Sequence, residues 1–303
     1  MKSTVSVMMV CYNAAPTLPL ALGSLLAQTS NDWELIFVDD GSTDCSFDIA
    51  KDIGDPRIRA FRFDTNRGRG VARQFALEKA DGDYLCILDA DDWMYPWRLQ
   101  AELDFLEAEP KAAVVSGGMA ILDKVGDLAG VRGLVNSDRP QLFPPMTRLR
   151  MPPFAFPSSM IRMRVAKLCK FDPGFLLAQD ADFLMQIILN HSYGILNQNI
   201  YAYTEYSTVT LKKLIMSSHF AGQMFKKHRA RFPLQSRING LRLFAKSMVY
   251  RGAFALNRSD WLVRRRSRLP MSTEMAEFNR ARSTVALKVE ETFGAPVSME
   301  SKL

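Results

Sequence analysis

Short apolar runs alternate with amphipathic stretches through the first 120 residues of the chain. Apolar runs bounded by turn residues predict strands, and apolar positions three or four residues apart predict helices. The expected strands cover residues 5–10, 35–38, 58–63, 84–88 and 112–116, and the expected helices cover residues 18–28, 71–80 and 98–109. Strands that alternate with helices are typical of βαβ units, so we predict an α/β fold with a mainly parallel, doubly wound sheet.

The pattern beyond these units is less regular. Residues 123–157 are rich in glycine, proline and charged side chains, and we expect a long irregular connection there. Three further elements are expected after it, namely helices at 159–170 and 182–190 and a strand at 195–203. From residue 211 the pattern is helical and basic. We therefore predict a first domain of residues 1–210 and a basic helical C-terminal region of residues 211–303.

The composition is that of an ordinary soluble globular protein, with 48% hydrophobic and 23% charged residues. The net charge of +7 is unevenly spread, because residues 211–270 contain 15 Lys or Arg residues and one acid, Asp260. Such asymmetry indicates an anionic partner. Two interpretations of the basic region are weighed equally, a helical subdomain with its charges in water and peripheral contact with an anionic membrane. An anionic glycan comes below both, and nucleic acid comes last.

No apolar run reaches the roughly 18–20 residues that a membrane-spanning helix needs. The first residues lead directly into a strand pattern, without the cleavage site of a signal peptide. We therefore expect a cytoplasmic protein, at most peripheral at the inner face of the cell membrane. The four cysteines are widely spaced and form no CxxC pair. They predict reduced and mostly buried thiols, with neither a disulfide framework nor a structural zinc site.

Polar clusters follow four of the predicted strands. They are Tyr12-Asn13 after the first strand, residues 39–44 after the second, residues 66–73 after the third and residues 89–92 after the fourth. Each cluster alone has an ordinary structural interpretation as a turn or a helix cap. Ligands of doubly wound sheets bind beyond the carboxyl ends of the strands, so four clusters at that edge together predict a binding site.

The residue types at this edge suit a nucleotide diphosphate held by a divalent ion. Asp89 and Asp91 place two carboxylates on the same side of an extended segment, and such oxygen ligands suit Mg²⁺ or Mn²⁺. Arg67, Arg69 and Arg73 add positive charge for a diphosphate, and Tyr12 is placed to stack on a base. The sequence lacks the glycine pattern of a dinucleotide-binding Rossmann turn and has no P-loop.

Four segments of the sequence together resemble a known family. Residues 5–14, 28–44, 82–92 and 171–183 contain the strings CYNA, FVDDGSTD, LDADD and QDADF. In this combination they closely resemble the family-two inverting glycosyltransferases of the GT-A fold, over about the first 210 residues. The resemblance implies the GT-A nucleotide-diphospho-sugar transferase fold, a Rossmann-like, mainly parallel twisted sheet flanked by helices, here with a basic helical extension.

The resemblance also implies roles on the donor side. Asp40 would accept a hydrogen bond from the uracil of a UDP-sugar, Asp89 would face the ribose or sugar, and Asp91 would hold Mn²⁺ or Mg²⁺ together with Asp89. The expected nucleotide-sugar contacts are Tyr12, Asn13, Asp40, Asn66, Arg69, Arg73, Asp89 and Asp91.

On the acceptor side, the resemblance implies that Asp180 is the general base. Gln179 replaces the glutamate that usually precedes it, and we expect Gln179 and Asp182 on the acceptor side. A second departure is Thr204, with Tyr206, where relatives often carry arginine and histidine. His219 is an alternative metal ligand there, although a partly exposed helix histidine is the favoured interpretation.

The implied activity is inverting, metal-dependent transfer of a sugar from a nucleotide-diphosphate sugar to a hydroxyl of a glycan or lipid-linked acceptor, as in polysaccharide or surface-glycan biosynthesis. In this mechanism Asp180 takes the proton of the attacking hydroxyl. The alternative is a catalytically silent nucleotide-sugar-binding or scaffolding protein of the same fold, which the departures at Gln179 and Thr204 keep open.

Overall fold

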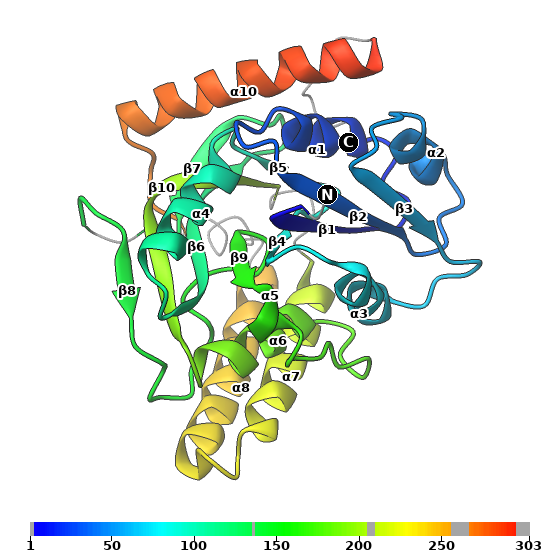
Figure 1. Cartoon of the computed structure of the whole chain (residues 1–303). Coiled ribbons are helices and arrows are strands. Elements are labelled where there is room, and N and C mark those ends of the chain that lie inside the picture. The colour runs from blue at the N-terminus through cyan, green and yellow to red at the C-terminus, as the bar shows by residue number, and fades with distance from the viewer. Residues whose placement is uncertain (1–2, 135–136, 205–209, 256–266, 295–303) are drawn as a thin grey trace.

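The computed structural model describes residues 3–134, 137–204, 210–255 and 267–294. One ten-stranded sheet crosses the molecule, with the strand order β3-β2-β1-β4-β9-β6-β10-β5 and with β7 and β8 paired at β6 and β10 (Figure 1). The strands are β1 (Val5–Cys11), β2 (Trp33–Asp39), β3 (Ile58–Arg62), β4 (Tyr84–Ile87), β5 (Trp93–Met94), β6 (Ala112–Leu122), β7 (Leu128–Arg132), β8 (Gln141–Phe143), β9 (Ser159–Arg162) and β10 (Ser192–Thr204).

The first half of the sheet is the predicted βαβ arrangement. β1 pairs in parallel with β2 and β4, and β2 pairs in parallel with β3. The connecting helices are α1 (Leu18–Leu26), α2 (Ser46–Lys51) and α3 (Arg69–Lys79). Six of the seven residues of β1 and all seven of β2 are buried, as expected of parallel strands covered on both faces. The α/β fold class predicted from the sequence is confirmed.

The second half of the sheet is mixed. β9 lies antiparallel between β4 and β6, while β6 and β10 are parallel to each other. The helix expected over residues 159–170 was therefore wrong in its first part, where β9 precedes the short α5 (Met163–Ala166). Residues 159–161 are fully buried, and pairing on both sides in the sheet overrides their helical periodicity. The segment 123–157, expected to be irregular, also contains β7 and β8.

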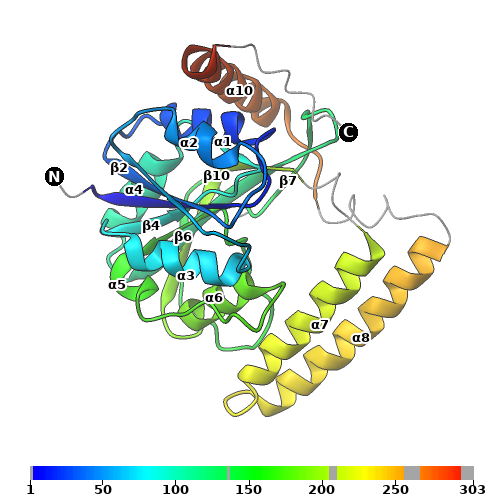
Figure 2. The same ribbon diagram turned by 90° about the vertical axis from the view of Figure 1, so that its right-hand side faces the viewer.

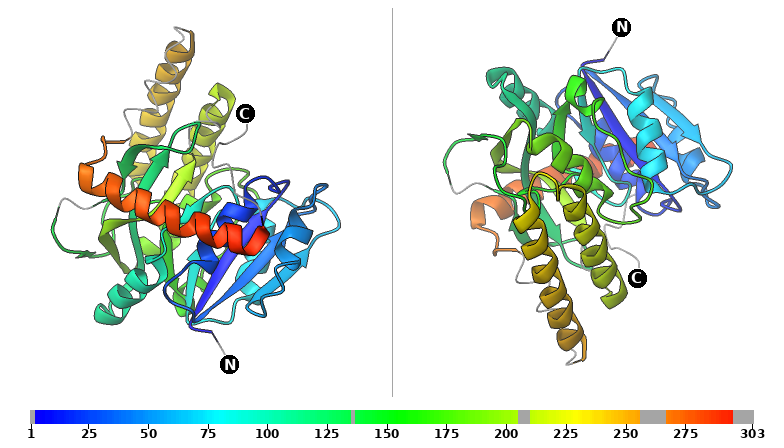
Figure 3. Two further views of the ribbon diagram at one scale, coloured as in Figure 1. Left: turned by 90° about the horizontal axis from the view of Figure 1, so that it is seen from above. Right: turned by 90° about the horizontal axis from the view of Figure 1, so that it is seen from below.

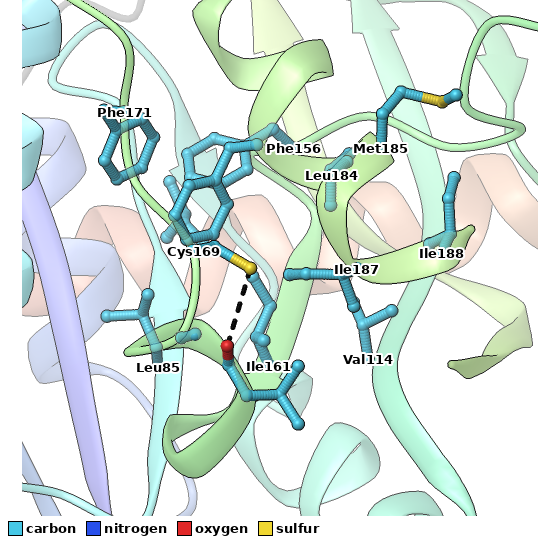
Figure 4. Packing of buried hydrophobic residues seen from close by; sticks show 14 of the residues in the cluster. Leu85, Val114, Phe156, Ile161, Cys169, Phe171, Leu184, Met185, Ile187 and Ile188 are labelled. Carbon is cyan, nitrogen blue, oxygen red and sulfur yellow. Dashed lines mark hydrogen bonds between the residues drawn. The ribbon is translucent and has the colours of Figure 1, made fainter. Parts of the chain in front are cut away.

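Two helices cover the second half of the sheet, α4 (Arg98–Ala108) and α6 (Gln179–Ile188). Beneath α6 lies a large apolar cluster, in which Leu184 and Ile187 of α6 face Phe156, Ile161 and Val114 from the connection and the sheet (Figure 4). The Phe171 ring stacks on Phe183 with centroids 4.2 Å apart. This packing fixes the position of α6 against the sheet, and with it the first turn of α6, which is at the candidate site.

The helices after residue 211 pack in two separate parts of the molecule. Helices α7 (Leu211–Lys227) and α8 (Pro233–Ala255) form a hairpin that extends away from the sheet, whereas α10 (Ser272–Phe293) returns to lie across α1 (Figures 2 and 3). Gly23 of α1 permits this contact, because a Cβ there would lie 2.3 Å from Cγ2 of Val289. The predicted boundary near residue 211 stays a prediction.

Within the described part of the chain, no helix combines the length and the apolar character needed to cross a membrane. All four cysteines are free thiols; Cys11, Cys86 and Cys169 are buried and Cys45 is exposed.

Candidate active site

The polar residues that follow β1, β2, β3 and β4 form one connected surface, here called the strand-end edge (residues 12–13, 39–44, 66–70 and 89–92). The first link joins the ends of β1 and β2. The Asn13 side chain accepts a hydrogen bond from the Thr43 backbone N–H (2.9 Å), and the Asn13 N–H donates to Ser42 Oγ (2.9 Å). Asn13 has φ 50°, a left-handed conformation that asparagine tolerates better than most residues. Tyr12 beside it is half exposed.

The second link joins the end of β2 to the loop after β3. The Asp40 carboxylate accepts hydrogen bonds from the backbone N–H groups of Arg67 (2.7 Å) and Gly68 (3.0 Å). Asp40 is buried, and this burial raises the pKa of its carboxyl group. Asp40 therefore anchors the loop that leads into α3, and its implied contact with uracil stays a prediction. Asn66, in the same loop, is exposed.

The third link joins α3 to the end of β4. Arg73 is almost completely buried, and its guanidinium donates to Asp89 Oδ1 at 3.0 Å. The same guanidinium lies 5.1 Å from the centroid of the Phe156 ring, a cation–π distance. Arg73 is thus held in place by an anion and an aromatic face, at the junction between the strand-end edge and the segment that contains Phe156.

Asp91 and Asp92 have different surroundings. Asp92 is buried, with its carboxylate accepting from the Tyr201 hydroxyl and the Thr204 backbone N–H, both at 2.9 Å. Asp91 as a residue is exposed to solvent, but protein atoms surround its carboxylate and reduce the hydration of that group. This partial burial, followed by the negative charge of Asp89, raises the pKa of Asp91. Asp92 therefore has a structural role, whereas Asp91 is available to a ligand. The Tyr201 hydroxyl also accepts from the Asp89 N–H (3.1 Å) and so joins β10 to this edge.

A recess of about 360 Å³ opens beside Arg69 and Arg73. Its remaining lining comes from the segment before β9, from the first turn of α6, from β10 and from α7. The lining residues are Arg69, Arg73, Met151, Pro152, Phe154, Ala155, Phe156, Leu177, Ala178, Gln179, Asp180, Ala181, Leu184, Tyr203, Lys213, Leu214 and Ser217. The part contributed by α6 and α7 is called the helical wall. The recess is therefore lined by both apolar and charged side chains.

Asp180 lies in the first turn of α6, in the helical wall, and is partly exposed. Its Oδ1 accepts a hydrogen bond from the Ala181 N–H at 2.8 Å. A carboxylate is stabilised at this position, because the first turn of a helix carries partial positive charge. The residue before this turn, Ala178, has φ 61°, a left-handed conformation that is uncommon for alanine. Gln179 is buried, and its Oε1 has no hydrogen-bond partner among the described residues. Both side chains that the sequence predicted here, Gln179 and Asp180, therefore line the recess.

Asp182 lies apart from the other predicted residues of the helical wall. Asp182 is fully buried and is absent from the lining of the recess. Its Oδ2 accepts from Lys227 Nζ of α7 at 2.8 Å, and Lys227 also contacts Asp172 at 3.0 Å. Asp182 follows Asp180 by two positions, and neighbours at this spacing point to different sides of a helix. It fastens α7 to α6 and does not line the recess, so its expected place on the acceptor side stays a prediction without a contact that supports it.

The sequence analysis did not identify the residues of α7 and β10 that line the recess. Lys213 lines the recess, and its charge acts on the Asp91 carboxylate together with that of Arg69. Tyr203 of β10 also lines the recess. No local motif distinguishes Lys213 from the other basic residues near it, so only the packing of α7 reveals its position. His219 is exposed on α7 and shares a hydrogen bond with Gln223, and Tyr206 lies outside the described residues.

Asp91 and Asp89 are the carboxylates that the sequence predicts as ligands of a divalent cation, and this role stays a prediction. No group of three or more His, Cys, Asp or Glu side chains could hold a metal ion in the part of the chain that the structure describes. Mg²⁺ needs only one or two protein carboxylates when a substrate phosphate and water complete its shell. Burial of the Asp91 carboxylate raises its pKa first, and the negative charge of Asp89 raises it further; a bound cation would oppose both effects. The pair therefore suits a metal bound together with a phosphate.

The sequence profile of the family described as Glycosyl transferase family 2 matches residues 6–172. Among curated relatives, EpsE of Bacillus subtilis is 34% identical over 169 residues, 55% of this chain and 59% of EpsE. WfaP of Escherichia coli, named as a UDP-Glc:alpha-D-GlcNAc-diphosphoundecaprenol beta-1,3-glucosyltransferase, is 35% identical over 105 residues, 35% of this chain and 42% of that protein. The matches thus span about half the length of these relatives.

Solved structures with the same fold cover nearly the whole chain. TarS of S. aureus in complex with UDP-GlcNAc has a TM-score of 0.57 at 19% identity, covering 97% of this chain and 83% of that one. A mannosyltransferase of Pyrobaculum calidifontis, in complex with GDP-Man and Mn2+, has a TM-score of 0.55 at 15% identity, with coverage of 97% and 88%. At these identities the likeness concerns the fold.

Proposed function

Because this chain belongs to glycosyl transferase family 2, we propose that it transfers a sugar from a UDP-sugar to a hydroxyl of a glycan or lipid-linked acceptor, with inversion at the anomeric carbon. The observation that carries the proposal is the position of Asp180, which lines the same recess as Arg69 and Arg73. A candidate base and the cations for a diphosphate thus border one cavity. The proposed process is the synthesis of a polysaccharide or surface glycan.

In the proposed reaction, the UDP-sugar lies along the strand-end edge with its diphosphate beside Arg69 and Asp91. Asp180 takes the proton from the acceptor hydroxyl, whose oxygen attacks the anomeric carbon from the face opposite the diphosphate. The bond to the diphosphate breaks, and UDP leaves with the electron pair. Inversion follows from this single displacement, since the base and the leaving group lie on opposite faces.

Stabilisation of the departing diphosphate is the second requirement. Arg69 and Lys213 border the recess near Asp91, so their charges are placed to oppose the negative charge that develops on UDP. A divalent cation bound at Asp91 and Asp89 would supply further positive charge there. Arg73 is held by Asp89 and Phe156, and this fixed position supports donor binding without reorganisation.

The thermal unfolding midpoint with UDP, GDP, CMP or dTDP, each with and without Mn²⁺, tests the donor site. A ligand at about 100 times its dissociation constant adds roughly 2.7 kcal/mol to the free energy of unfolding. We expect a Mn²⁺-dependent rise with UDP. A rise with another nucleotide alone would overturn the UDP assignment, and no rise with any of them would contradict the donor site.

Turnover separates the enzyme from a silent binding protein. UDP-sugars that raise the midpoint are incubated with glycan and lipid-linked acceptors, and the anomeric configuration of the product is determined by NMR. Product with inverted configuration is expected. Donor binding without transfer to any acceptor would favour the nucleotide-sugar-binding alternative, and retained configuration would refute the role of Asp180 as the base for the attacking hydroxyl.

A further inference from the structure

Helix α8 has apolar side chains on two opposite faces. One face packs on the rest of the molecule, where Tyr250 and Ala253 are buried and Tyr250 clusters with Leu214 of α7. At its first turns, Ser236 donates to the Phe225 carbonyl (2.9 Å) and Asn239 to the Leu149 carbonyl (2.6 Å). These contacts hold one face of α8 against the rest of the molecule, whereas among the described residues the apolar side chains of the opposite face are exposed.

The opposite face exposes a series of large apolar side chains. Their exposed fractions are 68% for Leu234, 37% for Ile238, 71% for Leu241, 67% for Phe244, 55% for Met248 and 54% for Val249. At about 100° per residue these positions fall on one side of the helix, roughly half a turn away from Asn239 and Tyr250. These six residues are called the outer stripe. An exposed apolar patch of this size is typical of an interaction surface.

Basic residues border the outer stripe on both sides. Arg251 falls along one margin of the stripe and Arg242 and Lys246 along the other, while Arg237 lies within the stripe beside Phe244. All four are exposed on α8. No acid interrupts this pattern, since residues 211–255 contain ten Lys or Arg residues and neither Asp nor Glu. The partner of the outer stripe must therefore accept apolar side chains and carry negative charge next to them.

We propose that the outer stripe of α8 docks on the surface of an anionic lipid bilayer. Such a surface offers acyl chains for Leu241 and Phe244 and anionic headgroups for the flanking cations, which is the pattern of an interfacial amphipathic helix. A second copy of the chain fits less well, because its outer stripe would bring equally basic margins together. The hairpin extends away from the sheet (Figure 2), so the stripe can reach a flat surface.

Docking of the outer stripe on the bilayer would also place the recess near the bilayer surface. Helix α7 lies beside α8 and supplies Lys213, Leu214 and Ser217 to the recess. An acceptor anchored in the same bilayer would then be presented to the helical wall. This consequence rests on the proposed function, whereas the docking itself does not.

Vesicle flotation of the protein of residues 1–303 tests the docking without any enzymatic readout. Phosphatidylcholine vesicles are compared with mixed phosphatidylcholine–phosphatidylglycerol vesicles, at low and high salt. We expect binding to the mixed vesicles that weakens with salt, because salt screens the headgroup charge. The double variant Leu241→Ser with Phe244→Ser should bind about tenfold or more weakly, since both side chains leave the acyl region. Arg242→Ser with Lys246→Ser should weaken binding by about fivefold for each charge.

The matched control is Leu168→Ser with Leu287→Ser, which removes leucines that are 80% and 63% exposed outside α8. We expect this control to bind like the original protein, and all variants to keep the same unfolding midpoint. No binding to mixed vesicles, equal binding to neutral vesicles, or equal loss in the control would each overturn the proposal. Sedimentation showing a dimer that only the α8 variants dissociate, without vesicle binding, would assign the stripe to a second copy instead.

Discussion

The strand-end edge and the helical wall border the same recess but hold their polar side chains differently. At the edge, the side chains of Asn13, Asp40 and Arg73 each bond to a neighbouring cluster, so the edge is ordered before a ligand binds. In the wall, Asp180 accepts one local hydrogen bond and Gln179 Oε1 has no described partner. Under the proposed function, the edge would be a preformed donor side, and the polar atoms of the wall would stay available for the acceptor.

The largest expected effect comes from removing the base in the helical wall. Asp180→Asn should lower turnover by about 10²–10⁴-fold, the usual contribution of a positioned base. Binding of UDP, measured by calorimetry, should be unchanged because the strand-end edge is intact. Asp104→Asn, an exposed carboxylate on α4, is the control. Turnover within twofold of the original protein would assign the base to another residue.

The second largest effect is expected from a substitution in the strand-end edge that leaves the helical wall unchanged. Asp91→Asn should weaken UDP binding in the presence of Mn²⁺ by about 10–100-fold, corresponding to the roughly 1.5–3 kcal/mol of a charged contact. Binding without Mn²⁺ should change little, and calorimetry with and without the ion measures both. Equal affinity of the variant and the original protein in Mn²⁺ would contradict the metal assignment.

The third prediction concerns stability: a substitution in the helical wall should lower the free energy of unfolding without changing UDP binding at the strand-end edge. Lys227→Met leaves the buried Asp182 carboxylate without its cation, and we expect the free energy of unfolding to fall by about 1–3 kcal/mol. Urea unfolding measures the change, with the adjacent exposed Lys226→Met as the control. UDP affinity should be the same in both variants. A similar loss in the two variants would show that the Asp182 pair does not stabilise the wall.

The smallest effect is expected where the wall meets the edge. Lys213→Met should reduce kcat/KM about tenfold, since one cation that faces the departing diphosphate is lost while the base remains. Lys212→Met, which changes an exposed neighbour outside the recess, should have no effect. If both variants behave alike, α7 contributes only general positive charge.

The strand-end edge could be predicted from the sequence because each cluster directly follows a strand with a strong apolar run. β1, β2 and β4 are central strands, and their carboxyl ends must meet at one edge of the sheet. The particular hydrogen bonds, such as Asp40 to the backbone of Arg67 and Gly68, depend on loop geometry and were not predicted.

The helical wall could be predicted only in part. Asp180 and Gln179 came from a resemblance to a family motif, while the inward Asp182 and the contribution of Lys213 depend on how α7 packs on α6. The strand at Ser159–Arg162 escaped prediction for a similar reason, since two partners far along the chain, β4 and β6, hold it in the sheet. Contacts between distant segments leave no local periodicity to detect.

The return of α10 to α1 has a consequence for the order in which the protein is made. Phe278, Val285 and Val289 pack in one apolar cluster with Trp93 and Tyr95, which immediately follow the aspartates of the strand-end edge. On the ribosome, that face of the nascent sheet stays uncovered until α10 has been synthesised, and α10 extends to Phe293, far along the chain from β5. The synthesis of α10 is then the step that covers this face of the sheet behind the site.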